Sequence, residues 1–173
     1  MRDARTLLTP DGFGGVVATV RDNNPDLPDA TARRIVVEAL KFVATAAQFP
    51  TVKITPSNVV DEGWHALILH TDLYEKLCDR LGRFVHHWPE RPDPERRDPH
   101  ALTRTAALIE QAGYRVDGEL WTAPTTALVA VAANCSHTPK PGGCGPINPG
   151  NCASHCSGGS GEGDDGQASC TYG

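Results

Sequence analysis

An aspartate and a histidine stand one helical turn apart, at Asp61 and His65, in a segment whose pattern predicts a helix. At about 100° per residue, His65 lies about 40° from Asp61 on the helical wheel, and Ile68 lies about 20° away on the other side. Both polar side chains therefore fall inside the apolar arc, which Trp64 and Leu69 extend on either side. The outer side is expected to carry Glu62, Gly63, Ala66 and His70. Because an unpaired buried charge is expensive, Asp61 and His65 need partners.

Two kinds of site fit this pair. The first is a hydrogen-bonded Asp–His pair that ties helices together or orients a loop. The second is a metal site, in which a third ligand comes from His86 or His87, in the proline-rich connection of residues 83–97. Two imidazoles and one carboxylate suit Zn²⁺ or Fe²⁺, with positions left open for water or substrate. Of the two loop histidines, His87 is preferred because it lies nearer the expected Trp88-Pro89 turn.

The other chemically capable residues fit structural roles. Cys78 falls on the apolar side of its helix, where a thiol acts as a small buried hydrophobe. His70 and His100 are expected at the surface. Trp64, Trp88 and Trp121 are expected to pack in the core or in a lid over it. No further acid or nucleophile stands out, so the catalytic residues, if any, stay unknown.

Four helices are expected to position these residues. Apolar side chains at the spacing of one helix face predict a helix from Asp29, as its N-cap, to Gln48. The next is expected from Thr55, with Pro56 in its first turn, to His70. A third spans about 72–81 and ends at Gly82. A fourth begins with Asp98 as its cap and stops at Gly113. Residues 114–133 slightly favour a short helix over a strand, with Pro124 interrupting them. The fold class is therefore all-α, a small helical bundle.

Composition and charge exclude several classes of protein. The net charge is −5, with no cluster of basic residues, and this excludes a nucleic-acid partner. The N-terminus lacks the apolar run of a secretory signal, and the longest apolar stretch, residues 127–133, is too short to span a bilayer. We therefore expect a soluble, cytoplasmic protein without a membrane partner. In that compartment thiols stay reduced, so clustered cysteines bind metal, react or are modified.

The C-terminal residues 135–173 differ from the rest of the chain. They hold 10 of the 17 glycines and 5 of the 6 cysteines, and too few large apolar residues for a core. A domain at 1–134 and a disordered tail at 135–173 are therefore expected. Cys152, His155 and Cys156 alone have tight spacing, which fits a soft site for Cu⁺ or Zn²⁺ better than a closed zinc knuckle. A tail of this composition also fits the substrate of a modifying enzyme, as in a ribosomal peptide precursor, or an inert solvated segment.

The chain resembles the glycine-rich domain-containing protein-like family over about residues 30–124. The residues that carry the resemblance are Val60-Asp61, Trp64-His65, Ile68-Leu69, Tyr74, Cys78, Phe84-Val85-His86-His87-Trp88-Pro89 and Leu120-Trp121. The resemblance implies a helical domain in which Asp61, His65 and one of His86 and His87 are the signature polar residues, often followed by a tail rich in glycine and cysteine. The sequence departs from the family pattern at Ala66 and His70, and it has Leu67 where members often carry a second histidine.

These observations favour a metal-binding helical domain, with Asp61, His65, His87 and His86 as candidate ligands of a zinc or iron divalent ion. The alternatives are a precursor or carrier whose tail is enzymatically modified, and an interaction module with a structural Asp–His pair. The oligomeric state and the reaction are not indicated by the sequence.

Overall fold

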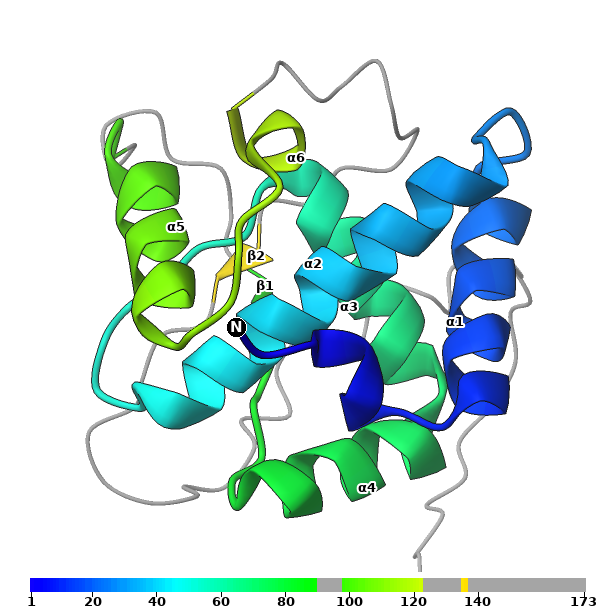
Figure 1. The fold of residues 1–173 in the computed structure, drawn as a ribbon, viewed down its shortest axis with the longest axis horizontal. Coiled ribbons are helices and arrows are strands. Elements are labelled where there is room, and N and C mark those ends of the chain that lie inside the picture. Colours follow the sequence, from blue (N-terminus) through cyan, green and yellow to red (C-terminus); the bar gives the residue numbers. More distant parts are fainter. Residues whose placement is uncertain (90–97, 123–134, 137–173) are drawn as a thin grey trace, which may run out of the picture. The chain divides into compact units, whose positions relative to one another are not determined.

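The computed structural model describes residues 1–89, 98–122 and 135–136 (Figure 1). A 3-10 turn at Ala4–Leu7 precedes the α-helices α1 (Pro10–Asn23), α2 (Asp29–Gln48), α3 (Asn58–Leu69), α4 (Thr71–Leu81), α5 (Ala101–Gln111) and α6 (Gly118–Thr122). Two short strands, β1 (Trp88–Pro89) and β2 (Cys135–Ser136), pair antiparallel. The fold is thus helical, as predicted. None of the helices in these ranges has the length and apolarity needed to cross a bilayer.

Helix α1 was not expected from the sequence. Its start is well specified, because the Thr9 side chain accepts a hydrogen bond from Gly12 N at 3.2 Å and Pro10 occupies the first turn. Its apolar residues Phe13, Val16, Val17 and Val20 are all buried. They follow the 3,4,7 spacing of a helix face, so the pattern is present in the sequence.

Helix α2 has the predicted bounds and lies at the centre of the core. Ile35, Val36, Ala39, Leu40 and Val43 are fully buried along it. The N-cap is Pro28, however, and not Asp29. Asp29 instead receives an ion pair from Arg33 at 2.7 Å, one turn further along the helix.

Helix α3 begins later than predicted and is buried on more sides. Its N-cap is Ser57, whose hydroxyl accepts from Val60 N, so the prediction of Thr55 as the cap is wrong. Glu62, Gly63 and Ala66 were expected to face outward but are buried, and Leu69 is 67% exposed. The physical reason is that α1, α2, α4 and α6 all pack against α3, which Figure 1 shows behind α2.

The remaining helices complete the framework. Gly82 ends α4 in the left-handed conformation (φ 74°), as predicted, and α4 begins at Thr71 instead of Asp72. Helix α5 has His100 and not Asp98 as its N-cap, since Asp98 accepts from His100 N before the helix starts. The short helix expected after residue 113 is present as α6.

Most of the region assigned to the tail lies outside the described residues. This holds for the predicted disorder, for Cys144, Cys152, Cys156 and Cys170, for His137 and His155, and for the segment that follows Pro124. Cys135 and Ser136, which were assigned to the tail, form strand β2.

Candidate metal centre

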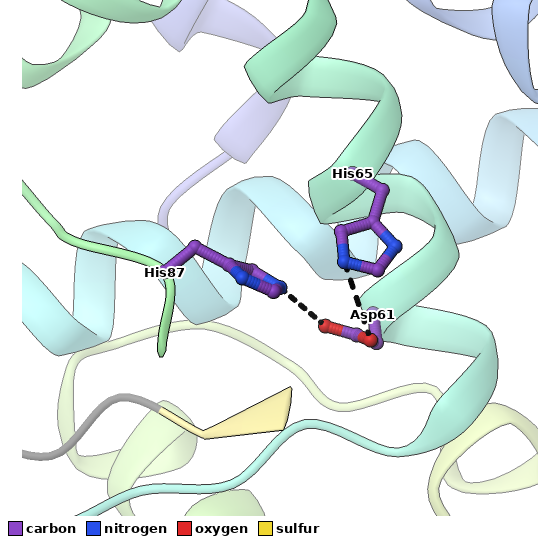
Figure 2. Close-up of side chains that lie close together, drawn as sticks. All are labelled: Asp61, His65 and His87. Atoms are coloured by element: carbon purple, nitrogen blue, oxygen red, sulfur yellow. Dashed lines mark hydrogen bonds and ion pairs between the residues drawn. The ribbon is translucent and has the colours of Figure 1, made fainter. Parts of the chain in front are cut away.

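Three polar side chains converge beside helix α3, as Figure 2 shows. Asp61 and His65 come from consecutive turns of α3, and His87 comes from the extended segment that precedes β1. His87 Nε2 lies 3.1 Å from Asp61 Oδ1, and His65 Nε2 lies 3.7 Å from Asp61 Oδ2. The potential ligand atoms of all three residues lie within 4.8 Å of one another. The structure therefore brings together the helical pair and one loop histidine.

The alternating burial of residues 84–88 explains why the loop histidine is His87. Side chains alternate between two sides of an extended chain. Val85 is fully buried and His87 is largely buried, whereas Phe84 is 49% exposed and Trp88 is 40% exposed. His86 falls on the exposed side, and its ring contacts Phe84 and Trp88 at centroid distances of 4.8 and 5.9 Å. His86 is thus outside the cluster.

The three side chains of the cluster differ in their exposure to solvent. The Asp61 side chain is 2% exposed, that of His87 is 13% exposed, and that of His65 is 30% exposed. The carboxylate thus lies at the inner end, and His65 lies nearest to solvent. A small molecule would reach the cluster from the side of His65.

One oxygen of the Asp61 carboxylate lacks a hydrogen-bond partner. Among the residues that the structure describes, Asp61 Oδ2 is the one buried side-chain polar atom without a hydrogen-bond partner. The other buried carboxylates in this part of the chain accept hydrogen bonds. Glu38 accepts from Trp121 Nε1 at 2.8 Å and from Lys41 Nζ, and Glu62 accepts from the Asn23 and Asn24 amides. Because buried polar groups are normally satisfied, the orphaned oxygen of Asp61 points to a missing partner.

The aromatic side chains of Trp64 and Tyr74 lie on the inner side of the cluster and are joined by a hydrogen bond. The ring of Trp64, which is fully buried, lies 4.4 Å from the His87 ring. Trp64 Nε1 donates to Tyr74 Oη at 2.9 Å, and Tyr74 Oη donates to the Val85 carbonyl at 2.6 Å. Cys78 is buried close by, as predicted, and burial raises the pKa of its thiol. Cys78 therefore stays protonated, and its thiol also interacts with the Tyr74 side chain and with the Val85 backbone.

The other histidines and tryptophans are placed as follows. His70 was expected at the surface but is half-buried, with Nε2 2.8 Å from Thr19 Oγ1 of α1. His100 is exposed, as predicted. Trp121 is in the core, as predicted, whereas Trp88 is partly exposed.

Sequence reasoning missed the buried carboxylates Glu38 and Glu62. A signal existed for Glu38, because it lies about 60° from Ile35 on the wheel of α2 and so falls within the apolar arc. No such signal existed for Glu62, whose burial depends on the contact between α3 and α1.

The donor set and its spacing fit a divalent ion. Metal bonds of about 2.0–2.2 Å in a tetrahedral arrangement separate neighbouring ligand atoms by about 3.4 Å. The observed separations of 3.1 and 3.7 Å lie on either side of that value. The two distances end on different oxygens of Asp61, and the potential ligand atoms of all three residues lie within 4.8 Å of one another.

Comparison with known proteins identifies the family. The family model described as UCP032817-like matches residues 12–107, a span that includes Asp61, His65 and His87. No curated protein and no solved structure matches the chain. The glycine-rich family name suggested by the sequence motifs is not part of this match. Since the match covers more than half of the 173 residues, the chain belongs to the UCP032817-like family.

Proposed function

We propose that this domain is a metalloprotein in which Asp61, His65 and His87 hold one divalent transition-metal ion. The observation that carries the proposal is the orphaned, buried oxygen Asp61 Oδ2, which lies among donors of the right type and spacing. An ion at this place would supply the partner that the carboxylate lacks. It would also offset the cost of keeping a negative charge away from water.

The donor set favours Zn²⁺ or Fe²⁺. Imidazole suits both metals, and two histidines with one carboxylate leave coordination positions open. An ion held in this way lowers the pKa of a water that it binds and polarises a substrate oxygen. Within the protein, the 30% exposure of His65 provides an approach from solvent, while Trp64 and His87 close the inner side. No reaction is assigned.

The competing explanation is a structural cluster without metal. The 3.1 Å contact between His87 Nε2 and Asp61 Oδ1 is a good hydrogen bond that ties the loop to α3. That bond satisfies one carboxylate oxygen and leaves the other without a hydrogen bond, since His65 Nε2 lies 3.7 Å from it. An ion bound by both oxygens of the carboxylate would give each of them a partner, with His87 Nε2 as a ligand in place of its hydrogen bond, and for this reason we prefer it.

Elemental analysis of the full-length protein tests the proposal. We expect about one equivalent of zinc or iron in the wild type, and the loss of that equivalent in His65→Ala. The matched control is His100→Ala, which removes an exposed histidine of α5's N-cap and should leave the metal content unchanged. Wild-type protein that binds neither metal, even after incubation with each ion, would overturn the proposal. So would equal metal content in all three proteins, because the metal would then lie elsewhere.

Metal removal provides an independent thermodynamic test. An ion that binds only the folded state stabilises it by about 2.7 kcal/mol when the free ion is at 100 times its Kd. We therefore expect chelation to lower the Tm of the wild type and to leave that of Asp61→Asn unchanged. Equal shifts in the two proteins would refute the assignment of Asp61 as a ligand.

A further inference from the structure

The three candidate ligands differ in how firmly the fold holds them. Asp61 and His65 are fixed relative to each other by the helical repeat of α3. His87 lies on an extended segment, where no helical hydrogen bonds hold the backbone. In addition, the neighbouring His86 offers the same imidazole one residue earlier. Something outside the segment must therefore set which of the two side chains faces α3.

A hydrogen-bond relay fastens this segment two residues before His87. Tyr74 Oη, from α4, donates to the Val85 carbonyl at 2.6 Å and accepts from Trp64 Nε1 at 2.9 Å. The Tyr74 hydroxyl thus acts as both a hydrogen-bond donor and a hydrogen-bond acceptor. Burial raises the pKa of Tyr74, so the phenol keeps its proton and remains a donor. Val85 itself is fully buried.

The relay also contacts the ligand directly. The ring of Trp64, whose N–H orients the Tyr74 hydroxyl, lies against the His87 ring at a centroid distance of 4.4 Å. Because side chains alternate along an extended chain, a buried Val85 places His87 on the inner side. A shift of the segment by one residue would instead turn His86 toward the cluster.

We infer that Tyr74 is a positioning residue that sets the register of the ligand-bearing segment and thereby selects His87 over His86 for the metal centre. The inference rests on the proposed function. Partners that orient a ligand from outside the coordination sphere typically change metal affinity by about 10–100-fold. Tyr74 acts through the Val85 carbonyl and through Trp64, and it does not touch the ion.

The test uses Co²⁺ as a spectroscopic probe in the full-length protein. Tyr74→Phe keeps the buried ring and removes only the hydroxyl. We expect its Kd for Co²⁺ to rise about 10–100-fold. At saturating Co²⁺, its visible absorption should differ from that of the wild type, because His87 is no longer held in the coordination sphere and His86 can take its place. Circular dichroism establishes that the variant is folded.

The matched control is Tyr114→Phe, which removes the hydroxyl of another buried tyrosine, one that packs beneath the Arg2 guanidinium. Its Kd and spectrum should equal those of the wild type. A Tyr74→Phe protein with wild-type Kd and spectrum would overturn this inference and leave the metal centre standing. A lower Tm with an unchanged Co²⁺ spectrum would also overturn it, since the hydroxyl would then serve stability alone. Wild-type protein that binds no Co²⁺ would overturn the proposed function, and this inference with it.

Discussion

Replacing Gly63 with alanine tests how closely α3 is held against α2. A Cβ built at Gly63 would lie 2.9 Å from Ala39 Cβ, from Ile35 Cγ2 and from Ile35 O. Ordinary contacts of this kind are about 3.5–4.0 Å, so the two helices would have to separate by several tenths of an ångström. Ala39 Cβ and the Ile35 carbonyl are fixed to the α2 backbone and cannot swing away.

Two opposing effects decide the sign of the change. Alanine is favoured over glycine inside a helix by about 1 kcal/mol. Overpacking of a well-packed core costs about 1–3 kcal/mol, and the rigid neighbours place Gly63→Ala near the upper end. We therefore expect a net loss of about 1–2 kcal/mol. For a chain of this size the loss lowers the Tm by about 2–8 °C.

Thermal and urea denaturation measure the effect, with Gly14→Ala as the matched control. A Cβ at Gly14, in α1, would meet nothing within 4 Å. That substitution should therefore raise stability by about 0.5–1 kcal/mol. If Gly63→Ala were as stable as Gly14→Ala, the close contact of α3 with α2 would be refuted.

Two further predictions concern how α3 and α6 are held. Ser57→Ala removes both the N-cap of α3 and a 2.6 Å hydrogen bond to the Leu120 carbonyl. We therefore expect the free energy of unfolding, measured in urea, to fall by about 2 kcal/mol, and Ser57→Thr should recover part of that loss. The Arg34 guanidinium, which donates to Asp117 at 2.6 and 2.8 Å, holds the pKa of that carboxyl below its usual value of 3.8. The stability that this pair contributes is present above about pH 4 and is lost as the pH falls through the lowered pKa of Asp117. The Tm of Arg34→Gln should therefore decline less steeply below about pH 4 than the Tm of the wild type. An equally steep decline in both proteins would contradict this assignment.

The pair Asp61 and His65 could be predicted from the sequence because their relation is local. A spacing of four residues in a helix places two side chains on one face, whatever surrounds the helix. The orientation of the rest of α3 was mispredicted because the wheel assumes one buried side. Gly63 and Ala66 are small, and small residues let neighbouring helices approach closely, so these positions are buried by contacts that depend on the tertiary fold.

The choice between His86 and His87 could not be made firmly from the sequence. An extended segment exposes one of two adjacent residues, and which one depends on an anchor elsewhere. Here the anchor is the Val85 carbonyl, which is bound by Tyr74 of α4. The preference for His87 had been based on its nearness to a turn, which is a different reason from the one that the geometry provides.

Helix α1 was overlooked for a different physical reason. Gly12, Gly14 and Gly15 give its first half the composition of a loop, since glycine disfavours helix. The N-cap hydrogen bond that Thr9 accepts and the burial of the valines outweigh that preference. Tertiary packing, which propensity does not include, therefore decides the structure of residues 10–23.

Anomalous diffraction from crystals of the zinc-loaded protein, recorded on both sides of the zinc absorption edge, tests the metal centre most directly. We expect one anomalous peak about 2.0–2.2 Å from an Asp61 carboxylate oxygen and from one imidazole nitrogen each of His65 and His87. A peak bound by cysteine sulfur elsewhere in the chain, or no peak between these three side chains, would contradict the account.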